Sequence, residues 1–312
     1  MTNMIRTYRY RVKDGNQARW LRSRARSVNE VWNWCNDIQK HTIRHNMKKW
    51  PTWFDLNKLS SGCGQELGLH SQTIQAVCEK YADSRKISKR PYLRYRGNKA
   101  RGWIPFKAAG IKLCHGAVVY CKRRLRFWDS REFPEEFKIL TGSFAEDSAG
   151  KWFLNVTIEI PDNECLPAEG QIGIDLGLKT LAAFSDGTKI ERSRFYRDLE
   201  PKIKIAQKAR KKRRIRALHL KIANRRRDKN HKVSTAIVRN HGLIVVGNVS
   251  SSKLAKTTMA KSVMDQGWSD FKTMLSYKAI GRSGIFLEVN EANTTRTCSS
   301  CGSRTGPKGF AG

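Results

Sequence analysis

The spacing of apolar residues along the chain predicts one strand followed by a helical region. Residues 4–12, MIRTYRYRV, alternate between apolar and polar positions, which is typical of a short strand. Five apolar residues then recur at steps of three and four, which places them on one buried face of a helix. They are Leu21, Ala25, Val28, Trp32 and Cys35. A second helix begins near Ser71, a suitable N-cap, and continues through Tyr81.

The middle of the chain changes to the alternating pattern of strands. The pattern runs from 111 to 161 and is clearest in KWFLNVTIEI, residues 151–160. We expect a small β-barrel or sheet here. The N-terminal strand should join it, so that the helices between them form an insertion. Pro161 and Pro167 mark a linker after this region.

A new strand after the linker ends in a carboxylate. In QIGIDLGLKTLAAFSDGTKI, residues 171–190, Ile172 and Ile174 alternate with Gly173 and Asp175. The chain then turns back to a hairpin signal at residues 185–187, Ser-Asp-Gly. Asp175 has two interpretations. It could bind one of a pair of divalent ions, as in RNase H-like nucleases, or it could end the strand for turn geometry alone.

The charge of the chain indicates a polyanionic partner. The 312 residues include 61 Lys and Arg against 27 Asp and Glu, a formal net charge of +34. Such an excess suits a nucleic acid better than a small acidic metabolite. Hydrophobic residues make up 39% of the chain, which is enough for one or two folded cores.

The sequence also indicates a compartment. It contains no apolar run of membrane-spanning length and no secretory signal at its start, so we expect no membrane association. Most of the 8 cysteines are scattered singly, which suits reduced thiols in the cytosol, and we expect a cytoplasmic protein associated with the bacterial nucleoid.

Two segments concentrate the positive charge. In residues 84–107 the cations are interleaved with Tyr92, Tyr95, Trp103 and Phe106. These aromatic rings could stack on the bases of RNA or single-stranded DNA, or they could be packed in the core, and the sequence leaves both possibilities open. The candidate contacts to phosphate or to a flanking DNA motif are Lys89, Arg90, Arg94, Arg96, Lys99 and Arg101.

The second basic segment, residues 202–232, holds 15 Lys or Arg and a single acid, Asp228. Ile215, Leu218 and Ile222 keep a helical spacing, so we expect one helix with a thin apolar edge. A phosphate backbone would neutralise cations at this density. The candidate backbone contacts are Lys208, Arg210, Lys211, Lys212, Arg213, Arg214 and Arg216.

Several motifs occur in the order found in one protein family. They include TYRYRVKDGNQ, VNEVWNWCN, LGLHSQTIQAVCEKYA, GKWFLNVTIEI, IGIDLGLKTLAAFSDG, DQGWSDFKTMLSYKA and TTRTCSSCGSRTGPKG. On these motifs the chain resembles TnpB, the transposon-encoded RNA-guided nuclease related to type V CRISPR effectors.

The resemblance implies an α+β, multidomain fold. A wedge-like β-barrel would comprise residues 1–12 and 103–168, and a helical recognition domain, 13–102, would be inserted in it. An RNase H-like RuvC domain, 169–312, would follow. The implied partners are a guide RNA with a structured scaffold and a double-stranded DNA target with a short flanking motif. We expect a monomer.

Departures from the family lead to a further expectation. TnpB-type nucleases use three carboxylates, and only Asp175 matches. Position 247, where the second is expected, is Gly247, and the third would lie beyond Gly312. We therefore expect a degenerate RuvC site, no enzyme activity and no cofactor for chemistry. The chain then resembles nuclease-dead TnpB-like repressors (TldR), which form a guide-directed R-loop at promoters. The alternatives are an active RNA-guided endonuclease and a decayed, general RNA-binding protein.

A cysteine pair near the C-terminus gives the last candidate site. Cys298 and Cys301 form half of a four-cysteine zinc knuckle. A structural zinc site needs four nitrogen or sulfur ligands, so we expect this remnant knuckle to hold no zinc.

Overall fold

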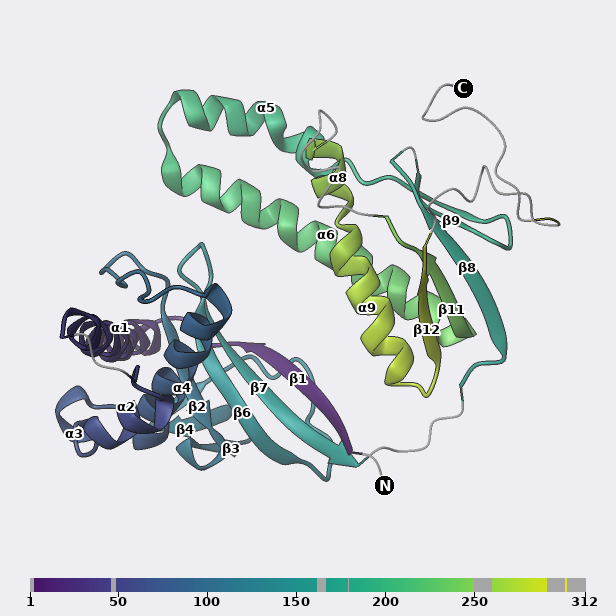
Figure 1. Ribbon diagram of the computed structural model, residues 1–312. Helices are drawn as coiled ribbons and strands as arrows, with labels where there is room; N and C mark the ends of the chain where they lie inside the picture. The colour runs from purple at the N-terminus through teal and green to yellow at the C-terminus, as the bar shows by residue number, and fades with distance from the viewer. Residues whose placement is uncertain are drawn as a thin grey trace. The chain divides into compact units, whose positions relative to one another are not determined.

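The computed structural model of the chain consists of two compact units (Figure 1). Unit 1 is Met1–Asp162 and unit 2 is Asn163–Gly312, and each is described by itself. The structure describes residues 3–45, 49–161, 167–178, 180–249, 260–290 and 301.

Unit 1 contains two antiparallel sheets. The larger has the order β1-β7-β6-β2, formed by Asn3–Arg11, Trp152–Pro161, Lys138–Glu146 and Trp103–Lys107. The smaller has the order β3-β4-β5, formed by Ile111–Cys114, Ala117–Tyr120 and Arg123–Arg126. Strand β1 pairs along its whole length with β7, from Asn3 opposite Pro161 to Arg11 opposite Phe153. This pairing confirms that the N-terminal strand joins the later sheet and that the helices are an insertion.

The inserted helices share one core with these strands. They are α1 (Asn16–Arg44), α2 (Trp53–Leu59), α3 (Gly64–Leu67) and α4 (Ser71–Ser88), and a short 3-10 turn (Ala108–Gly110) follows β2. All five apolar residues of the predicted α1 stripe are buried. They join a single cluster with Ile74 of α4, Ile104 of β2 and Leu154 of β7. The division into a wedge barrel and a recognition domain stays a prediction, because helices and strands form one cluster.

Helix α4 differs from the sequence prediction at its first residue. Ser71 is not the N-cap but the first helical residue, and His70 takes the N-cap position. The ring Nδ1 of His70 accepts a hydrogen bond from the backbone N–H of Gln72 at 3.2 Å. An imidazole therefore replaces the hydroxyl that normally satisfies a free N–H at a helix start.

Unit 2 is built on a mixed sheet with the order β10-β9-β8-β11-β12. The strands are Lys189–Glu191, Thr180–Phe184, Gly170–Leu176, His241–Gly247 and Ile285–Val289 in that order. Strands β8, β9 and β10 are antiparallel, whereas β11 runs parallel to both β8 and β12. The hairpin predicted at residues 185–187 joins β9 to β10. The assignment of this sheet to a RuvC-like fold stays a prediction.

The helices of unit 2 form two apolar clusters. Helices α5 (Phe195–Lys208) and α6 (Lys212–Asn240) pack against each other through a small cluster that includes Ile203 and Leu218. The last turns of α6 and helix α9 (Trp268–Ile280) pack on the sheet with Ile174 and Val246. The short helix α8 (Ala260–Gln266) precedes α9. The single helix predicted over 202–232 is therefore wrong, because the chain breaks between two helices at residues 209–211.

Candidate nucleic-acid interface

Most of the predicted phosphate contacts are exposed, and they lie on two surfaces of different construction. We call residues 89–101 of unit 1 the clamped segment and residues 195–240 of unit 2, which form α5, α6 and the turn between them, the basic hairpin. Of the thirteen cationic candidates, only Arg96 is partly buried. The others are exposed: Lys89, Arg90, Arg94, Lys99, Arg101, Lys208, Arg210, Lys211, Lys212, Arg213, Arg214 and Arg216.

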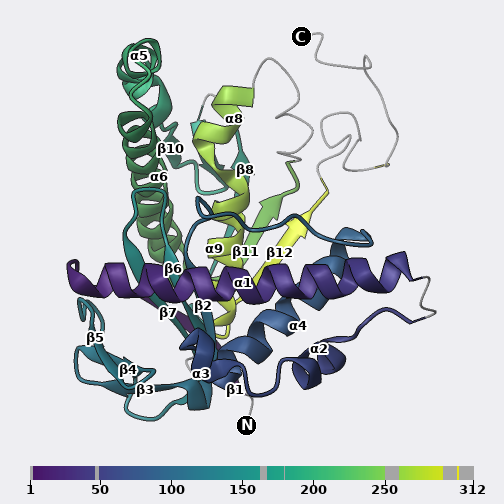
Figure 2. The same cartoon turned by 90° about the vertical axis from the view of Figure 1, so that its left-hand side faces the viewer.

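The clamped segment has no helix or strand, and side chains of α1 make hydrogen bonds with its backbone. Figure 2 shows the chain after α4 returning along α1. Asn36 donates to the carbonyl of Leu93 at 2.8 Å and accepts from the N–H of Leu93 at 2.9 Å. Asn33 makes the same pair of bonds with Arg96, at 3.0 and 2.8 Å. Two side-chain amides one helical turn apart therefore fix the backbone at two points, much as a neighbouring strand would.

Arg96 is held inside unit 1 and not at a free phosphate-binding surface. Its guanidinium lies 3.6 Å from the centre of the Trp32 ring and 5.2 Å from that of Trp103. Burial lowers the pKa of Arg96 to about 10. A cation between two indole faces is a structural contact, so Arg96 differs from the other predicted phosphate contacts.

The aromatic residues of the 84–107 segment divide between the two interpretations left open by the sequence. Phe106 is buried in the core and Trp103 packs against it. Tyr92 and Tyr95 are 48% and 42% exposed. The ammonium of Lys40, on α1, lies over both rings, 5.0 Å from the centre of Tyr92 and 4.3 Å from that of Tyr95.

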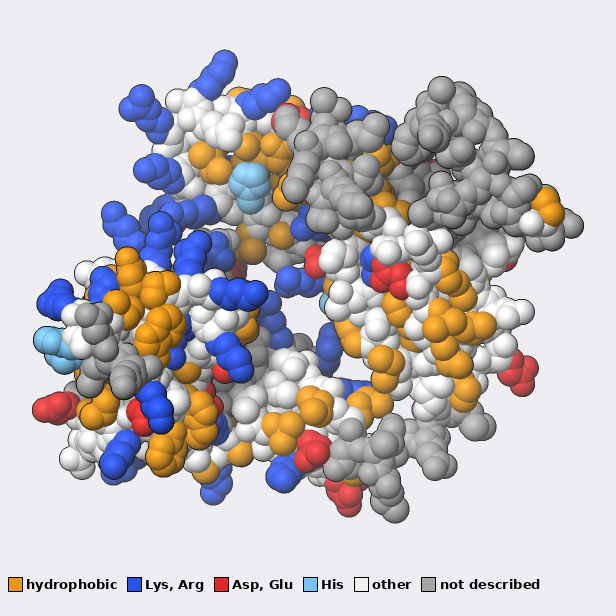
Figure 3. All heavy atoms as spheres, viewed as in Figure 1, with side chains coloured by type: hydrophobic (Ala, Val, Ile, Leu, Met, Phe, Trp, Pro, Cys, Tyr) orange, Lys and Arg blue, Asp and Glu red, His pale blue; other side chains and the backbone are white. Residues whose placement is uncertain are grey.

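The basic hairpin carries its cations on two antiparallel helices (Figure 1). Figure 3 shows Lys and Arg side chains crowded over α5, α6 and the turn that joins them. In this turn Lys211 donates its N–H to the carbonyl of Ala206 at 2.9 Å, and Arg210 takes a left-handed conformation with φ of 49°. The turn thus needs a conformation that non-glycine residues seldom adopt, and it presents Arg210, Lys211 and Lys212 together.

Asp265, in α8, binds the first turn of α5, where the basic hairpin begins. The buried carboxylate of Asp265 accepts from the backbone N–H of Tyr196, in the first turn of α5, at 3.1 Å. Burial raises the pKa of Asp265 above its ordinary value, against the opposing effect of this hydrogen bond. Asp265 lies with Arg192, Arg194 and Arg197 around a cavity of about 200 Å³. A negative side chain at a helix start is favourable, so Asp265 serves as a cap from outside the helix.

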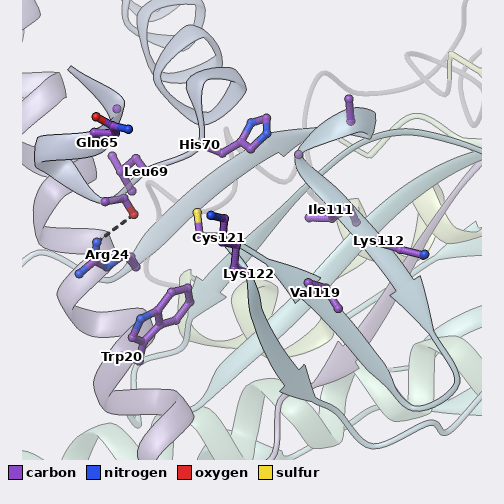
Figure 4. Close-up of a pocket in the computed structure, with 14 residues that line it drawn as sticks. Trp20, Arg24, Gln65, Leu69, His70, Ile111, Lys112, Val119, Cys121 and Lys122 are labelled. Carbon is purple, nitrogen blue, oxygen red and sulfur yellow. Dashed lines mark hydrogen bonds between the residues drawn. The ribbon is translucent and has the colours of Figure 1, made fainter. Parts of the chain in front are cut away.

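A larger pocket of about 610 Å³ lies in unit 1 between α1, the residues before α4 and the smaller sheet (Figure 4). Trp20, Arg24, His70, Lys112 and Lys122 are among its lining residues. The Arg24 guanidinium donates to the carbonyls of Leu67 and Gly68, at 3.1 and 2.8 Å, so it is already used to hold the chain.

Asp175 is exposed near the end of β8, as predicted, opposite Ala183 of β9. On its other side β8 pairs with the parallel strand β11, where Ile174 lies opposite Val246. One residue further along both strands, Gly247 is therefore the residue of β11 beside Asp175. Gly247 has no side chain to offer. Glu288 of β12 is paired with Val246, but its carboxylate binds the Lys272 ammonium at 2.5 Å.

Among the residues that the structure describes, no group of three His, Cys, Asp or Glu side chains suited to a metal is found. Cys298 of the predicted zinc knuckle lies outside the described residues, and Cys301 is exposed. The expectations about zinc and other cofactors stay predictions. Among the described residues, no helix has the length and apolar character needed to span a membrane.

Comparisons with known proteins show which proteins the chain is similar to. Residues 155–258 match the family model of probable transposases, OrfB_IS605, and residues 268–310 match the Cas12f1-like TNB domain. The fold is similar to a chain in the cryo-EM structure of a Cas12f1–sgRNA–target DNA complex, with a TM-score of 0.60 over 99% of this chain and 93% of that one, at 11% identity.

Two curated proteins are similar in sequence. The first is the putative RNA-guided DNA endonuclease InsQ of Escherichia coli (strain K12), 33% identical over 57% of this chain and 51% of that protein. The second is a putative RNA-guided DNA endonuclease of Streptomyces pristinaespiralis, 29% identical over 80% of this chain and 65% of that protein. The chain thus spans about half to two thirds of the length of these relatives.

These matches confirm the resemblance to the TnpB/IS605 family and the mixed α and β fold, and they correct one prediction. The expectation that the protein is not an enzyme is contradicted, because both relatives are named endonucleases. We withdraw that expectation and the loss of activity inferred from Gly247. The repressor subtype is not confirmed.

Several residues that shape the interface were not predicted from the sequence. Asn33, Asn36 and Lys40 all lie on α1, for which only the apolar stripe was predicted. Their spacing of three and four along one side of the helix is a signal that could have been used. Asp265 gives no such signal, because its partner Tyr196 is 69 residues away in the chain.

Proposed function

We propose that this chain is an RNA-guided DNA endonuclease, which binds a guide RNA and is directed by it to matching DNA. The observation that carries the proposal is the pair of relatives named as such enzymes, one aligned with 80% of this chain. The similarity in fold to Cas12f1 over 99% of the chain supports it.

Exposed cations among the described residues support the binding part of this proposal. Twelve exposed cations on the clamped segment and the basic hairpin suit phosphate backbones, whose charge dominates affinity for nucleic acids. In RNA-guided systems base pairing with the guide selects the target, and the protein contacts the backbone and a short flanking motif. For strand cleavage, Asp175 is the described carboxylate best placed as a catalytic candidate.

Sequencing the RNA that co-purifies with the chain tests the guide. We expect one discrete species with a constant scaffold and a variable 3′ end. A random sample of cellular RNA would overturn the proposal and favour a general RNA-binding protein.

Cleavage is tested with the purified complex and DNA that matches the recovered guide, in buffer containing Mg²⁺. We expect matched DNA to be cut, mismatched DNA to stay intact, and Asp175→Ala to abolish cutting while binding is retained. Guide-dependent binding of matched DNA without any cutting would refute the endonuclease and favour a guide-directed DNA-binding protein.

A further inference from the structure

One surface of unit 1 combines exposed aromatic rings, a shared cation and a fixed backbone. We call Lys40, Tyr92 and Tyr95 the tyrosine platform. The Lys40 ammonium lies within 5.0 Å of both ring centres, and the Tyr95 hydroxyl donates to the carboxylate of Asp37. Both rings remain more than two fifths exposed.

The platform is rigid because its backbone is fixed from α1. The side chains of Asn33 and Asn36 make four hydrogen bonds with the backbone of Leu93 and Arg96. These two fixed positions lie on either side of Tyr95 in the sequence, and Leu93 directly follows Tyr92. Asn36 is itself fully buried and accepts from the Tyr81 hydroxyl at 2.9 Å. A surface ordered before binding loses little conformational freedom when a ligand arrives.

The chemistry of the platform fits one kind of ligand. Aromatic faces stack on nucleobases regardless of sequence, and nearby cations bind the phosphates that link them. The exposed cations of this region include Arg44 on α1 and Lys89, Arg90 and Arg94 on the clamped segment. Asp37 is the acid in contact with the platform, and its carboxylate is hydrogen-bonded to Tyr95.

A single strand fits this surface better than a duplex. Bases in a duplex are stacked on each other, so their faces are not available to a protein ring without unstacking. Phosphates alone would need cations but no exposed tyrosines.

We propose that the tyrosine platform binds a single-stranded stretch of nucleic acid by stacking bases on Tyr92 and Tyr95. The inference rests on the proposed function for its biological ligand, such as an unpaired part of a guide RNA. Binding of short oligonucleotides needs neither guide nor cleavage, so the platform and the endonuclease can fail separately.

Photocrosslinking locates the contact directly. The full chain, freed of co-purified RNA, is mixed with a 12-nucleotide oligo(U) carrying one 4-thiouridine, irradiated and mapped by mass spectrometry. We expect crosslinks at Tyr92 or Tyr95, and competition by unlabelled oligo(U) or oligo(dT) but not by an equal mass of duplex. Crosslinks confined to other segments, or equal competition by duplex, would overturn the proposal.

Substitutions separate stacking from charge. We expect Tyr92→Ala with Tyr95→Ala to weaken oligo(dT) binding about tenfold, since a stacked base contributes substantially to affinity. Binding of an abasic 12-mer, which has the same phosphates, should change less than twofold. Equal loss for both ligands, or no loss for oligo(dT), would overturn the inference.

Two sets of control variants exclude a purely structural role. Tyr92→Phe and Tyr95→Phe keep the rings and should keep oligo(dT) binding, whereas loss of binding in these variants would contradict stacking. Trp128 is a matched control, because it is 56% exposed and the Lys13 ammonium lies 4.9 Å from its ring centre. Trp128→Ala should leave oligo(dT) affinity unchanged, and a tenfold loss there would mean that any exposed ring has the same effect.

Discussion

The clamped segment and the basic hairpin are both dense in cations, yet they acquire their shapes in opposite ways. The hairpin forms its own backbone hydrogen bonds in two helices and buries a small cluster that includes Ile203 and Leu218. The clamped segment forms no such structure, and Asn33 and Asn36 of α1 bond its backbone. Positive charge therefore indicates a partner without indicating which cations are available to it.

The two surfaces also differ in what they can recognise. The candidate cations of the basic hairpin are exposed, and the rings of Tyr196 and His219 there have their centres 6.3 Å apart, whereas Tyr92 and Tyr95 of the clamped segment share the Lys40 ammonium. The basic hairpin suits the phosphate backbone of single-stranded or double-stranded nucleic acid, whereas the clamped segment also suits contact with bases. Four sets of substitutions test this difference, from the largest expected effect to the smallest.

Asn36→Ala should produce the largest change, because it removes both bonds to Leu93 and leaves the buried Tyr81 hydroxyl without its acceptor. We expect the free energy of unfolding to fall by about 3 kcal/mol. Urea unfolding measures this loss, and faster tryptic cleavage at Arg94 would show that the clamped segment has been released. Asn33→Ala, in a half-buried position, should lose about 1 kcal/mol. Equal, small losses for both variants would show that α1 does not clamp the segment.

Replacing Arg213, Arg214 and Arg216 together by Gln should weaken nucleic-acid binding without affecting folding. We expect affinity to fall about 30-fold, or about 2 kcal/mol. The slope of log K against log salt should decrease by about two to three units, since each lost phosphate contact removes up to one counterion. Fluorescence anisotropy across a salt series measures both quantities. Lys189→Gln, Arg192→Gln and Arg282→Gln remove the same charge from exposed positions of unit 2 outside the basic hairpin. An equal loss of affinity in this control variant would show that the effect comes from net charge and not from the positions of the three arginines.

Arg96 and Arg94 should give opposite results although they are two residues apart. Arg96→Ala removes the cation between Trp32 and Trp103, so we expect a loss of about 1.5 kcal/mol in the free energy of unfolding. Arg94→Ala should leave stability unchanged and reduce affinity a fewfold. Thermal unfolding and anisotropy, measured on both variants, separate the two roles. Loss of affinity in Arg96→Ala at unchanged stability would reverse our assignment.

Asp265→Asn should give the smallest change and the clearest dependence on pH. Because burial raises the pKa of Asp265 in the fold, the folded state favours the protonated carboxyl more than the unfolded state does. The contribution of Asp265 to the free energy of unfolding is greatest below the ordinary carboxyl pKa of about 3.9. It is lost as the pH rises through the raised pKa that Asp265 has in the folded state. Asp265→Asn should therefore lose no stability as the pH rises through the raised pKa, and it should be slightly more stable than the unsubstituted chain at neutral pH. Urea unfolding from acidic to neutral pH measures this difference in the free energy of unfolding.

Asp228→Asn is the matched control for this pH profile, since Asp228 is exposed and paired with Lys232 at 2.8 Å. A neutral-pH gain in Asp265→Asn that persists unchanged below the carboxyl range would contradict the explanation from burial.

Local patterns were enough to predict most of the elements. The apolar stripe of α1, the alternation of β7 and the hairpin at residues 185–187 are all present, because each depends on residues close in sequence. The break at residues 209–211 was not predicted, since it depends on how α5 packs against α6 and not on a glycine or proline in the sequence. Resemblance to a family supplied what periodicity could not, namely the expectation of a nucleic-acid-guided protein.

The candidate site was predicted less completely than the fold. Asp175 lies on β8 as expected, and twelve of the thirteen cations are exposed. The inference from Gly247 to an inactive protein is contradicted by the relatives named as endonucleases. The chemistry of a metal site depends on side chains from several strands, so one residue type at one position was insufficient evidence.

The sequence by itself determined the expectation of a polyanionic partner, most of the strands and helices, and the family resemblance, because charge and periodicity are properties of the chain. Only the tertiary structure decided which cations and rings are available. Arg94 and Arg96 are alike in sequence, but one is exposed and the other lies between two indoles. Tyr95 and Phe106 belong to the same basic segment, but one remains exposed and the other is buried. The physical reason is that burial depends on residues brought together from distant positions, which here are α1, β2 and the segment clamped between them.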